Sequence, residues 1–239
     1  MKGYVHSLQS MGTLDGPGVR AVLFTEGCPL RCAYCHNPDT WECRAEDAVE
    51  HTEIAERVLR LYPYIKNGGV TFSGGEPCAQ AKFVCEVAKI LRAKGLHIAI
   101  DTCGDIDNSD VDELLGVTDL VLLDVKFTTE ADYAKYCGGS LERTMRFLDK
   151  LERLGKDVWI RHVVVPNLND NEEDVSRLAE LLRGYKCIKK VDFLPFKTLC
   201  REKYQALGIS FPLANTRQMD KNRLDELYKG FEGEFLKNY

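Results

Sequence analysis

Short apolar runs rich in β-branched residues alternate with amphipathic stretches along most of the chain. Apolar runs of about four to eight residues are typical of buried strands, whereas apolar positions three or four residues apart are typical of helices. The expected strands are Arg20–Thr25, Gly69–Phe72, His97–Ile100, Leu120–Leu123, Val158–Val164 and Lys190–Leu194. The expected helices are Thr52–Ile65, Ala79–Ala93, Asp110–Leu115, Leu141–Leu154, Glu172–Leu182 and a last one from Met219 to Leu236.

The order of these elements indicates an α/β fold with a parallel sheet. Strands alternate with helices at intervals of about 30 residues, the length of a βαβ unit. Six units are too few for a closed eight-stranded barrel, which takes about 250 residues. Either an open barrel of six units or a doubly wound sheet fits this pattern, and in both the chemistry gathers at the C-terminal ends of the strands. Since no linker or change of composition divides the chain, we expect one domain over residues 1–239.

Charge and hydropathy narrow the class of protein. The chain has 32 basic and 37 acidic residues, a net charge of −5, so we expect neither nucleic acid nor an anionic membrane surface as a partner. Its apolar runs are far shorter than the roughly 20 residues of a spanning helix, and the N-terminus does not read as a secretory signal. We therefore expect a cytoplasmic protein. Its ten cysteines are then thiols available for metal binding or catalysis rather than structural disulfides.

Three of these cysteines stand close together after the first expected strand. Cys28, Cys32 and Cys35 form a CxxxCxxC pattern, and a short loop of this kind can turn three thiolates toward one metal centre. A [4Fe–4S] cluster normally has four thiolate ligands, so three would leave one iron open to a reacting molecule. The other seven cysteines have no ligand spacing, and we interpret them as small buried side chains.

Two other interpretations of the cysteines remain open from spacing alone. Cys32 and Cys35 could form a thioredoxin-like redox pair, although this leaves Cys28 without a role. Cys28, Cys32, Cys35 and His36 could bind zinc. Adjacent ligands at 35 and 36 would strain to reach one tetrahedral ion, and structural zinc sites usually use two separated ligand pairs.

A glycine-containing loop follows the second expected strand. In Ser73-Gly74-Gly75-Glu76-Pro77, the two glycines let backbone N–H groups approach a ligand, and successive N–H groups can bind an anion. A plain strand-to-helix turn, with Pro77 in the first helical turn, is the alternative.

Polar residues also end or interrupt the later strands. Asp101 and Thr102 follow the third strand, and Asp124 and Lys126 follow the fourth, where a site would lie unless they form a solvated pair at the rim of the sheet. Arg161 and His162 interrupt the apolar fifth strand, so one of them must face the inner side of the sheet. We interpret Arg161 as the residue of the site and His162 as structural.

The cysteine spacing, with an aromatic residue before the third cysteine, resembles the radical S-adenosylmethionine superfamily. Within it, the chain is most similar to the activating enzymes of glycyl-radical enzymes, the pyruvate formate-lyase-activating family, over nearly its whole length. The matching segments are His6-Ser7, Asp15-Gly16-Pro17-Gly18-Val19-Arg20, Cys35-His36-Asn37, Asp39-Thr40-Trp41, Ser73-Gly74-Gly75-Glu76, Asp101-Thr102, Leu122-Leu123-Asp124-Val125-Lys126, Trp159-Ile160-Arg161 and Val165-Pro166.

This resemblance implies an open (β/α)6 barrel that holds a [4Fe–4S] cluster on Cys28, Cys32 and Cys35. It implies that S-adenosylmethionine is cleaved reductively to methionine and a 5′-deoxyadenosyl radical, which takes a hydrogen atom from a glycine Cα of a partner enzyme. The residues implied for the S-adenosylmethionine pocket are Tyr34, His36, Asn37, Gly74, Gly75, Glu76, Asp124, Val125, Lys126 and Lys197. Lys197 stands where many family members carry a His, and lysine offers a donor but no acceptor.

The resemblance implies further roles outside this pocket. Asp15, Arg20 and Arg161 are expected in catalysis or in the loop that contacts the protein substrate. Asp101, Thr102 and Asp124 are expected as oxygen ligands of a monovalent cation. A one-electron donor such as flavodoxin or ferredoxin is expected as a second partner.

The partner enzyme follows from the loop after the triplet. Between Cys35 and Gly74 the only cysteine is Cys43, so the ligands of a cluster-containing insert are absent and pyruvate formate-lyase is the favoured partner. An open barrel wall would admit its glycine loop sideways. The alternatives are another insert-free activating enzyme, a radical S-adenosylmethionine enzyme with a small-molecule or nucleoside substrate, and a zinc-binding interaction domain without activity.

Overall fold

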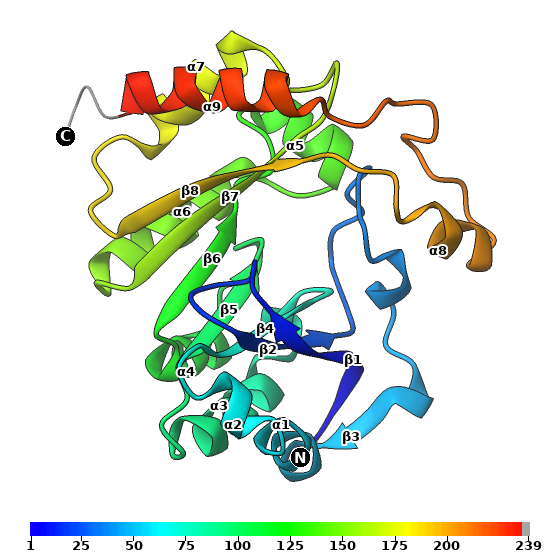
Figure 1. Ribbon diagram of the computed structural model, residues 1–239, viewed down its shortest axis with the longest axis vertical. Coiled ribbons are helices and arrows are strands. Elements are labelled where there is room, and N and C mark those ends of the chain that lie inside the picture. The colour runs from blue at the N-terminus through cyan, green and yellow to red at the C-terminus, as the bar shows by residue number, and fades with distance from the viewer. Residues whose placement is uncertain (236–239) are drawn as a thin grey trace.

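A computed structural model describes residues 1–235 of the chain (Figure 1). The strands are β1 (Lys2–Gly12), β2 (Arg20–Thr25), β3 (Ala48–Glu50), β4 (Gly69–Gly74), β5 (Ile98–Thr102), β6 (Leu120–Asp124), β7 (Asp157–Val164) and β8 (Ile188–Pro195). The helices are α1 (His51–Leu59), α2 (Tyr62–Ile65), α3 (Ala81–Arg92), α4 (Ser109–Val117), α5 (Glu130–Cys137), α6 (Leu141–Arg153), α7 (Glu172–Leu182), α8 (Arg201–Ala206) and α9 (Lys221–Phe235), with 3-10 turns η1 (Pro38–Thr40), η2 (Ala45–Asp47) and η3 (Pro77–Gln80).

All eight strands belong to one sheet, in the order β3-β1-β2-β4-β5-β6-β7-β8. The six strands from β2 to β8 pair in parallel, and β1 pairs antiparallel with both β2 and β3. The parallel strands follow chain order without a reversal, so the doubly wound alternative is wrong and the expected open (β/α)6 barrel is confirmed. β3 and β8 are the two edges of the sheet, and the wall of the barrel stays open between them (Figure 1).

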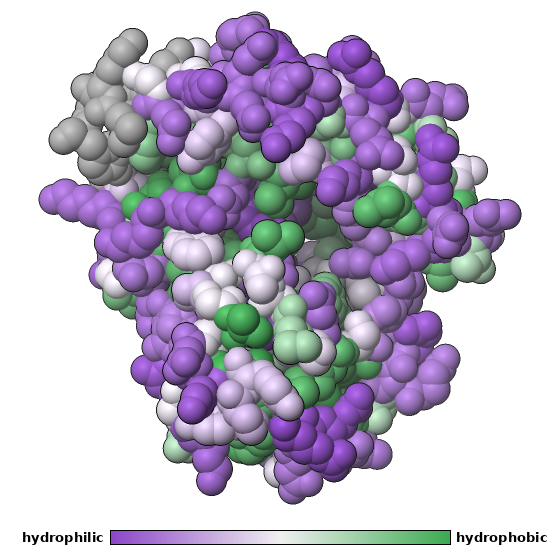
Figure 2. Space-filling model, in the orientation of Figure 1, coloured by the Kyte–Doolittle hydropathy of each residue, from purple (hydrophilic) through white to green (hydrophobic). Residues whose placement is uncertain are grey.

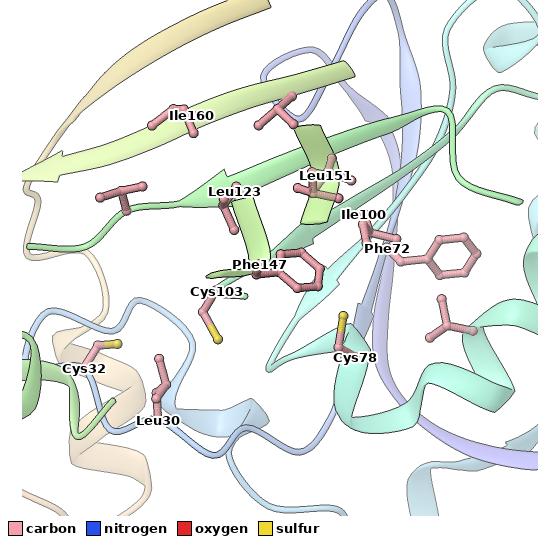
Figure 3. Packing of buried hydrophobic residues seen from close by; sticks show 14 of the residues in the cluster. Leu30, Cys32, Phe72, Cys78, Ile100, Cys103, Leu123, Phe147, Leu151 and Ile160 are labelled. Carbon is pink, nitrogen blue, oxygen red and sulfur yellow. The ribbon is translucent and has the colours of Figure 1, made fainter. Parts of the chain in front are cut away.

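The two faces of the curved sheet differ in what covers them. Phe72, Ile100, Leu123 and Ile160, from four neighbouring strands, belong to the main core beneath the helices, where α6 contributes Phe147 (Figure 3). On the inner face, a separate small cluster of Ala99, Leu120 and Leu122 packs against Trp159 and fills the barrel floor. Because both faces are buried, the strands have near-continuous apolar sequences rather than an alternating pattern.

The six expected parallel strands are all confirmed, with shifts of a few residues at their ends. β5 begins at Ile98 instead of His97, and β8 begins at Ile188 instead of Lys190. β4 ends at Gly74, β5 at Thr102 and β6 at Asp124. Residues that were expected just after these strands are therefore their last residues, next to the site.

Four elements have no counterpart in the expectations. β1 lies next to the edge of the sheet and interleaves apolar with polar residues, and β3 has only three residues, so neither forms an apolar run. α5 and α8 are short and carry few apolar positions. Such elements gain their stability from tertiary contacts, which sequence periodicity does not register.

The expected helix Thr52–Ile65 is two helices. α1 ends at Leu59 and α2 starts at Tyr62, with Pro63 in the first turn of α2. The proline ring clashes with the carbonyl four residues earlier in a continuous helix, which explains the break. The last helix starts at Lys221 rather than Met219, and its expected end at Leu236 lies outside the described residues. In the described part of the chain, every helix is too short or too polar to cross a membrane.

Candidate active site

A cavity of about 380 Å³ lies at the C-terminal ends of the parallel strands. The face of the molecule in Figure 2 is hollowed between the N-terminal strands and the segment that contains β8 and α8. Of the residues expected from the sequence, those that line the cavity are Asp15, Cys28, Cys32, Tyr34, Cys35, His36, Asn37, Gly74, Gly75, Glu76, Asp101, Asp124, Lys126, Arg161 and Lys197. Residues separated by most of the chain are therefore brought to one site.

Backbone hydrogen bonds hold the first part of the cysteine loop in place. The N–H of Gly27 donates to the carbonyl of Thr40 at 2.9 Å, and the N–H of Cys28 donates to the carbonyl of Trp41 at 3.2 Å. Gly27 itself has a φ of 85°, a left-handed conformation in which a side chain would be strained. The loop that carries the thiols is thus fixed to the segment that follows it.

The second part of the loop rests on the end of α5. The N–H of Arg31 donates to the carbonyl of Cys137 at 2.9 Å, and the N–H of Ala33 donates to the carbonyl of Tyr136 at 2.7 Å. The ring of Tyr34 packs on Phe127, which stacks on Tyr136. α5 is therefore the platform on which the central thiol is positioned.

The three thiols are partly or largely buried. Burial raises the pKa of Cys28 to about 12 and that of Cys35 to about 11, so both are protonated thiols in the chain alone. A hydrogen bond from Cys137 lowers the pKa of Cys32. Metal coordination displaces thiol protons, so loading of a cluster would release them and would be favoured by higher pH.

The donor set fits an iron–sulfur cluster with one open iron. Three soft sulfur donors from one loop line a single cavity, and thiolates are the protein ligands that iron–sulfur clusters take. Over residues 1–235, no three Cys, His, Asp or Glu side chains already stand close enough together to hold one metal ion. In a cluster each thiolate binds a different iron, so Cys28, Cys32 and Cys35 need not meet at one point to hold it.

The Gly74-Gly75-Glu76 loop is packed too tightly for side chains at its glycines. A Cβ at Gly74 would lie 2.4 Å from the backbone N of Thr25, and one at Gly75 would lie 2.5 Å from the carbonyl oxygen of Gly27. Glu76 is 1% exposed. Its carboxylate accepts hydrogen bonds from the Thr102 hydroxyl at 2.6 Å, the Cys103 N–H at 2.8 Å and the Cys78 N–H at 3.0 Å. Glu76 thus joins the end of β4 to the end of β5.

A group of charged side chains forms the floor of the cavity. The guanidinium of Arg161 donates to the carboxylates of Asp15 at 3.2 Å and of Asp101 at 3.1 Å, and Asp101 also accepts from Ser73 at 2.8 Å. Burial raises the pKa of Asp101 to about 6, although Arg161 acts in the opposite direction. One carboxylate oxygen of Asp101 is buried and has no hydrogen-bond partner. It is an acceptor that a bound ligand could use.

A second charged pair lies beside the first. The ammonium of Lys126 donates to the Asp124 carboxylate at 2.7 Å, and both side chains line the cavity. Burial alone would lower the pKa of Lys126, but the Asp124 carboxylate raises it, so the lysine stays charged. Val125, between them, points into the core. Its N–H donates to the carbonyl of Arg161 at 3.0 Å, so the expected Val125 contact is limited to its backbone.

The segment after β8 connects back to the cysteine loop. His36 Nε2 donates to the carbonyl of Lys197 at 2.8 Å, and Lys203 donates to Asn37 at 2.8 Å and to Asp39. The hydroxyl of Tyr204 donates to the carbonyl of Cys35 at 3.2 Å. This brings Lys197 to the cavity wall, where the resemblance expects a residue of the pocket.

Arg20 does not reach the cavity. It is fully buried beneath the barrel floor, where its guanidinium donates to Thr71 at 2.7 Å, to the carbonyl of Val70 at 2.7 Å and to the carbonyl of Gly68. It also donates to the carbonyl of Pro17 at 3.0 Å, within the Asp15–Val19 loop. The expected substrate contact of Arg20 is thus replaced by a structural role, because its strand position faces the closed end of the barrel.

The expected cation ligands are not brought together. Successive strand residues face opposite sides, so Asp101 points into the cavity while the Thr102 hydroxyl points away and donates to Glu76. Asp101 and Asp124 are already paired with Arg161 and Lys126. Asp101 and Asp124 thus line the cavity without the Thr102 hydroxyl, and the cation role of the three residues stays a prediction.

Sequence reasoning missed several residues of the site. The cavity is also lined by Phe24, Leu30, Trp41, Ser73, Cys103, Val163, Leu194 and Pro195. The platform residues Tyr136 and Cys137 belong to α5, whose ends carry recognisable signals: Thr129 caps the first turn by accepting from the Asp132 N–H, and Gly138 follows the helix with a φ of 70°. These capping signals would have located the helix.

Comparisons with known proteins agree with this geometry. Residues 22–179 match the Radical SAM superfamily. The chain is 41% identical to the pyruvate formate-lyase-activating enzyme of Clostridium pasteurianum over 95% of this chain and 96% of the relative. It is 41% identical to the enzyme of the same name from Staphylococcus epidermidis over 96% of this chain and 95% of the relative.

Solved structures support the fold. A domain of the pyruvate-formate lyase-activating enzyme from Bacteroides vulgatus superposes with a TM-score of 0.59 at 20% identity, over 70% of this chain and 95% of that one. Streptococcus suis SuiB bound to the precursor peptide SuiA superposes with a TM-score of 0.68 at 18% identity, over 89% of this chain and 45% of that one. With the sequence identity over almost the full length, these likenesses place the chain in the pyruvate formate-lyase-activating enzyme family of the radical S-adenosylmethionine superfamily.

Proposed function

We propose that this chain activates pyruvate formate-lyase by forming a radical on a backbone glycine of that enzyme. The observation that carries the proposal is the single cavity at the strand ends, which gathers three thiols of one loop, a two-glycine loop and the Asp124–Lys126 pair. The relatives from Clostridium and Staphylococcus bear this activity in their names.

Some residues of the cavity would bind the cluster and S-adenosylmethionine, and others would line the cavity with apolar walls that exclude water. Cys28, Cys32 and Cys35 would hold a [4Fe–4S] cluster, which supplies the electron that cleaves S-adenosylmethionine to methionine and a 5′-deoxyadenosyl radical. The backbone of Gly74 and Gly75, with the side chains of His36, Asn37 and Lys197, would orient the methionine end. Lys126 and Asp124 would bind polar groups of the nucleoside end, while Phe24, Leu194 and Tyr34 supply apolar walls.

The protein substrate would approach through the open wall of the barrel. Asp15 reaches the cavity floor, and the same β1–β2 segment exposes Met11 and Leu14, with Leu14 82% exposed. On the other side of the opening, Leu199, Leu207 and Ile209 are exposed. Apolar side chains on both sides suit a peptide loop better than a small polar metabolite.

The electron would come from a one-electron carrier such as a flavodoxin or ferredoxin, in a cytoplasmic setting. The thiols open to a cavity wall rather than lying in a sealed core, which suits reduction by an external protein. No second cofactor of the chain is required for this step, because one electron per S-adenosylmethionine balances the cleavage.

The proposal is tested with the full chain, reconstituted anaerobically with iron and sulfide. Reduced with dithionite and given S-adenosylmethionine, it should form methionine and 5′-deoxyadenosine in equal amounts. Formation should increase when pyruvate formate-lyase is added. If the reduced protein binds iron but forms no 5′-deoxyadenosine, the proposed chemistry is wrong. If it binds zinc and no cluster, the interaction-domain alternative replaces it.

A further inference from the structure

We propose that Cys32 and Cys137 form a reversible disulfide when the chain lacks its cluster, with a peroxide as the oxidant. Cys137 is the last residue of α5, far from the triplet in sequence, and no part of the proposed reaction uses it. The inference rests on the proposed function, because a cluster iron would occupy the same Cys32 sulfur.

The backbones around the two cysteines run side by side. The N–H groups of Arg31 and Ala33, which flank Cys32, donate to the carbonyls of Cys137 and Tyr136 at 2.9 and 2.7 Å. A disulfide needs Cα atoms about 4.4–6.8 Å apart. Because hydrogen bonds on both sides of Cys32 hold its backbone against Cys137 and Tyr136, we expect a bond between the two sulfurs to need little movement of either segment.

The two thiols also affect each other. Cys137 lowers the pKa of Cys32, and Cys32 raises the pKa of Cys137. Burial is the main cause of the raised pKa values of Cys28 and Cys35, and Cys32 adds to both. The backbone hydrogen bonds and this mutual effect together single out Cys137 as the partner of Cys32.

The difference in burial between the two cysteines decides which of them reacts with the peroxide first. Cys32 is 9% exposed and lines the cavity, whereas Cys137 is fully buried behind it. A small peroxide entering the cavity meets Cys32 first. The sulfur of Cys32 attacks one peroxide oxygen and breaks the O–O bond, which gives a sulfenic acid and, with the thiol proton, water when the oxidant is hydrogen peroxide.

Cys137 then completes the disulfide. Its sulfur attacks the sulfenic sulfur, the S–O bond breaks and water leaves with the thiol proton. Two electrons pass in total from the two thiols to one peroxide. Because the disulfide stops Cys32 at a reversible stage, it protects the thiol from irreversible sulfinic acid. A dithiol reductant restores the ligand set for cluster assembly.

The test uses the full-length chain without cluster, treated anaerobically with one equivalent of hydrogen peroxide. Digestion without reductant and mass spectrometry should find a peptide pair joined through Cys32 and Cys137, and dithiothreitol should separate it. Cys187→Ser, which changes a buried cysteine elsewhere, should keep this crosslink, and Cys137→Ser should lose it. Cys137→Ala serves in place of Cys137→Ser if the serine variant does not fold.

Two measurements make the inference falsifiable. Oxidised wild type should take up iron and sulfide only after dithiothreitol treatment, and protein already carrying a cluster should form no crosslink. A crosslink of Cys32 to Cys28 or Cys35 in the wild type, with none to Cys137, would overturn the inference. If the crosslink fails but the reduced wild type takes up a cluster normally, only the disulfide is disproved. A reduced wild type that takes up no cluster contradicts the proposed function itself.

Discussion

The ring Nδ1 of His162 donates a hydrogen bond of 2.7 Å to the carbonyl oxygen of Val125. The other ring nitrogen, Nε2, accepts from the Asn169 side-chain amide at 3.2 Å. These partners fix the neutral form of the ring with its proton on Nδ1. Since Asp124 and Lys126 flank Val125 and line the cavity, a buried histidine on β7 holds the backbone from which both project.

This arrangement predicts a pH dependence of stability. Burial lowers the pKa of His162, with the carbonyl of Val125 and the carboxylates of Asp174 and Asp124 acting in the opposite direction. In the unfolded chain a histidine has a pKa of about 6.5, so below this pH the unfolded state binds a proton that the folded state does not. The stabilising contribution of neutral His162 is therefore present above about pH 6.5 and is lost as the pH falls toward the lowered folded pKa.

The stability of the wild type is compared with that of a His162→Gln variant. Glutamine keeps an amide donor and does not titrate. Urea unfolding of both proteins from about pH 7.5 to about 5.5 should show the free energy of unfolding of the wild type falling more steeply. Subtracting the variant removes the contribution of His97, whose pKa is also lowered by burial. A constant difference between the two proteins across this range would mean that His162 does not titrate in this way.

Replacement of Arg20 should affect stability rather than cofactor binding. Arg20→Met removes the donor from the buried carbonyls of Gly68 and Val70, the partly buried carbonyl of Pro17 and the Thr71 hydroxyl. At roughly 1–3 kcal/mol for each unsatisfied group, the free energy of unfolding should fall by about 3 kcal/mol or more. Arg146→Met, at an exposed position with a 3.9 Å ion pair, is the matched control and should cost less than about 1 kcal/mol. An Arg20→Met protein that has normal stability but fails to bind S-adenosylmethionine would show instead that Arg20 takes part in binding.

Replacement of Glu76 should disturb the loop that it anchors. Glu76→Gln keeps one oxygen acceptor but turns an NH₂ group toward a donor, either the Cys103 N–H or the Thr102 hydroxyl. We expect the affinity for S-adenosylmethionine, measured by calorimetry on the cluster-loaded protein, to fall about tenfold or more, since a mispaired charged hydrogen bond costs roughly 1.5–3 kcal/mol. Glu86→Gln, at a half-buried position of α3 that pairs with Lys89 outside the cavity, should leave affinity unchanged. Equal affinity for wild type and Glu76→Gln would show that the carboxylate does not set the loop.

The cysteine assignment predicts a sharp difference between two variants. Cys32→Ala should abolish assembly of the cluster, followed by iron content and visible absorbance after reconstitution. Cys187→Ala should assemble it fully, because Cys187 lies before β8 and outside the cavity. If both variants lost cluster assembly equally, the result would contradict the assignment of the triplet as the cluster ligands.

The sequence predicts the parts of the site that lie within short motifs. The spacing of Cys28, Cys32 and Cys35 indicated one metal site, and the family resemblance made it a cluster site. The strand ends at Asp101 and Asp124 needed only the apolar runs before them. The positions of Arg20 and Thr102 could not be predicted in this way, because their roles depend on where their side chains point from the sheet. Adjacent residues such as Asp101 and Thr102 face opposite sides, and only the register of the neighbouring strands decides which side is the cavity.

Contacts across long sequence separations were beyond sequence reasoning. Cys137 and Cys32 meet because α5, a short helix with little hydrophobic periodicity, ends against the cysteine loop. The hydrogen bond that holds the Val125 carbonyl comes from a strand residue, His162, which is itself held by a loop residue, Asn169. Neither pairing leaves a local pattern, since tertiary packing alone brings these segments together.

The proposed activity places a radical on a glycine of pyruvate formate-lyase. It is measured by electron paramagnetic resonance of pyruvate formate-lyase after anaerobic incubation with the reduced cluster-loaded chain and S-adenosylmethionine. We expect a glycyl radical signal that is absent when the radical-bearing glycine is changed to alanine and absent with the Cys32→Ala chain. A chain that cleaves S-adenosylmethionine at full rate and leaves pyruvate formate-lyase without this signal would not have the proposed activity.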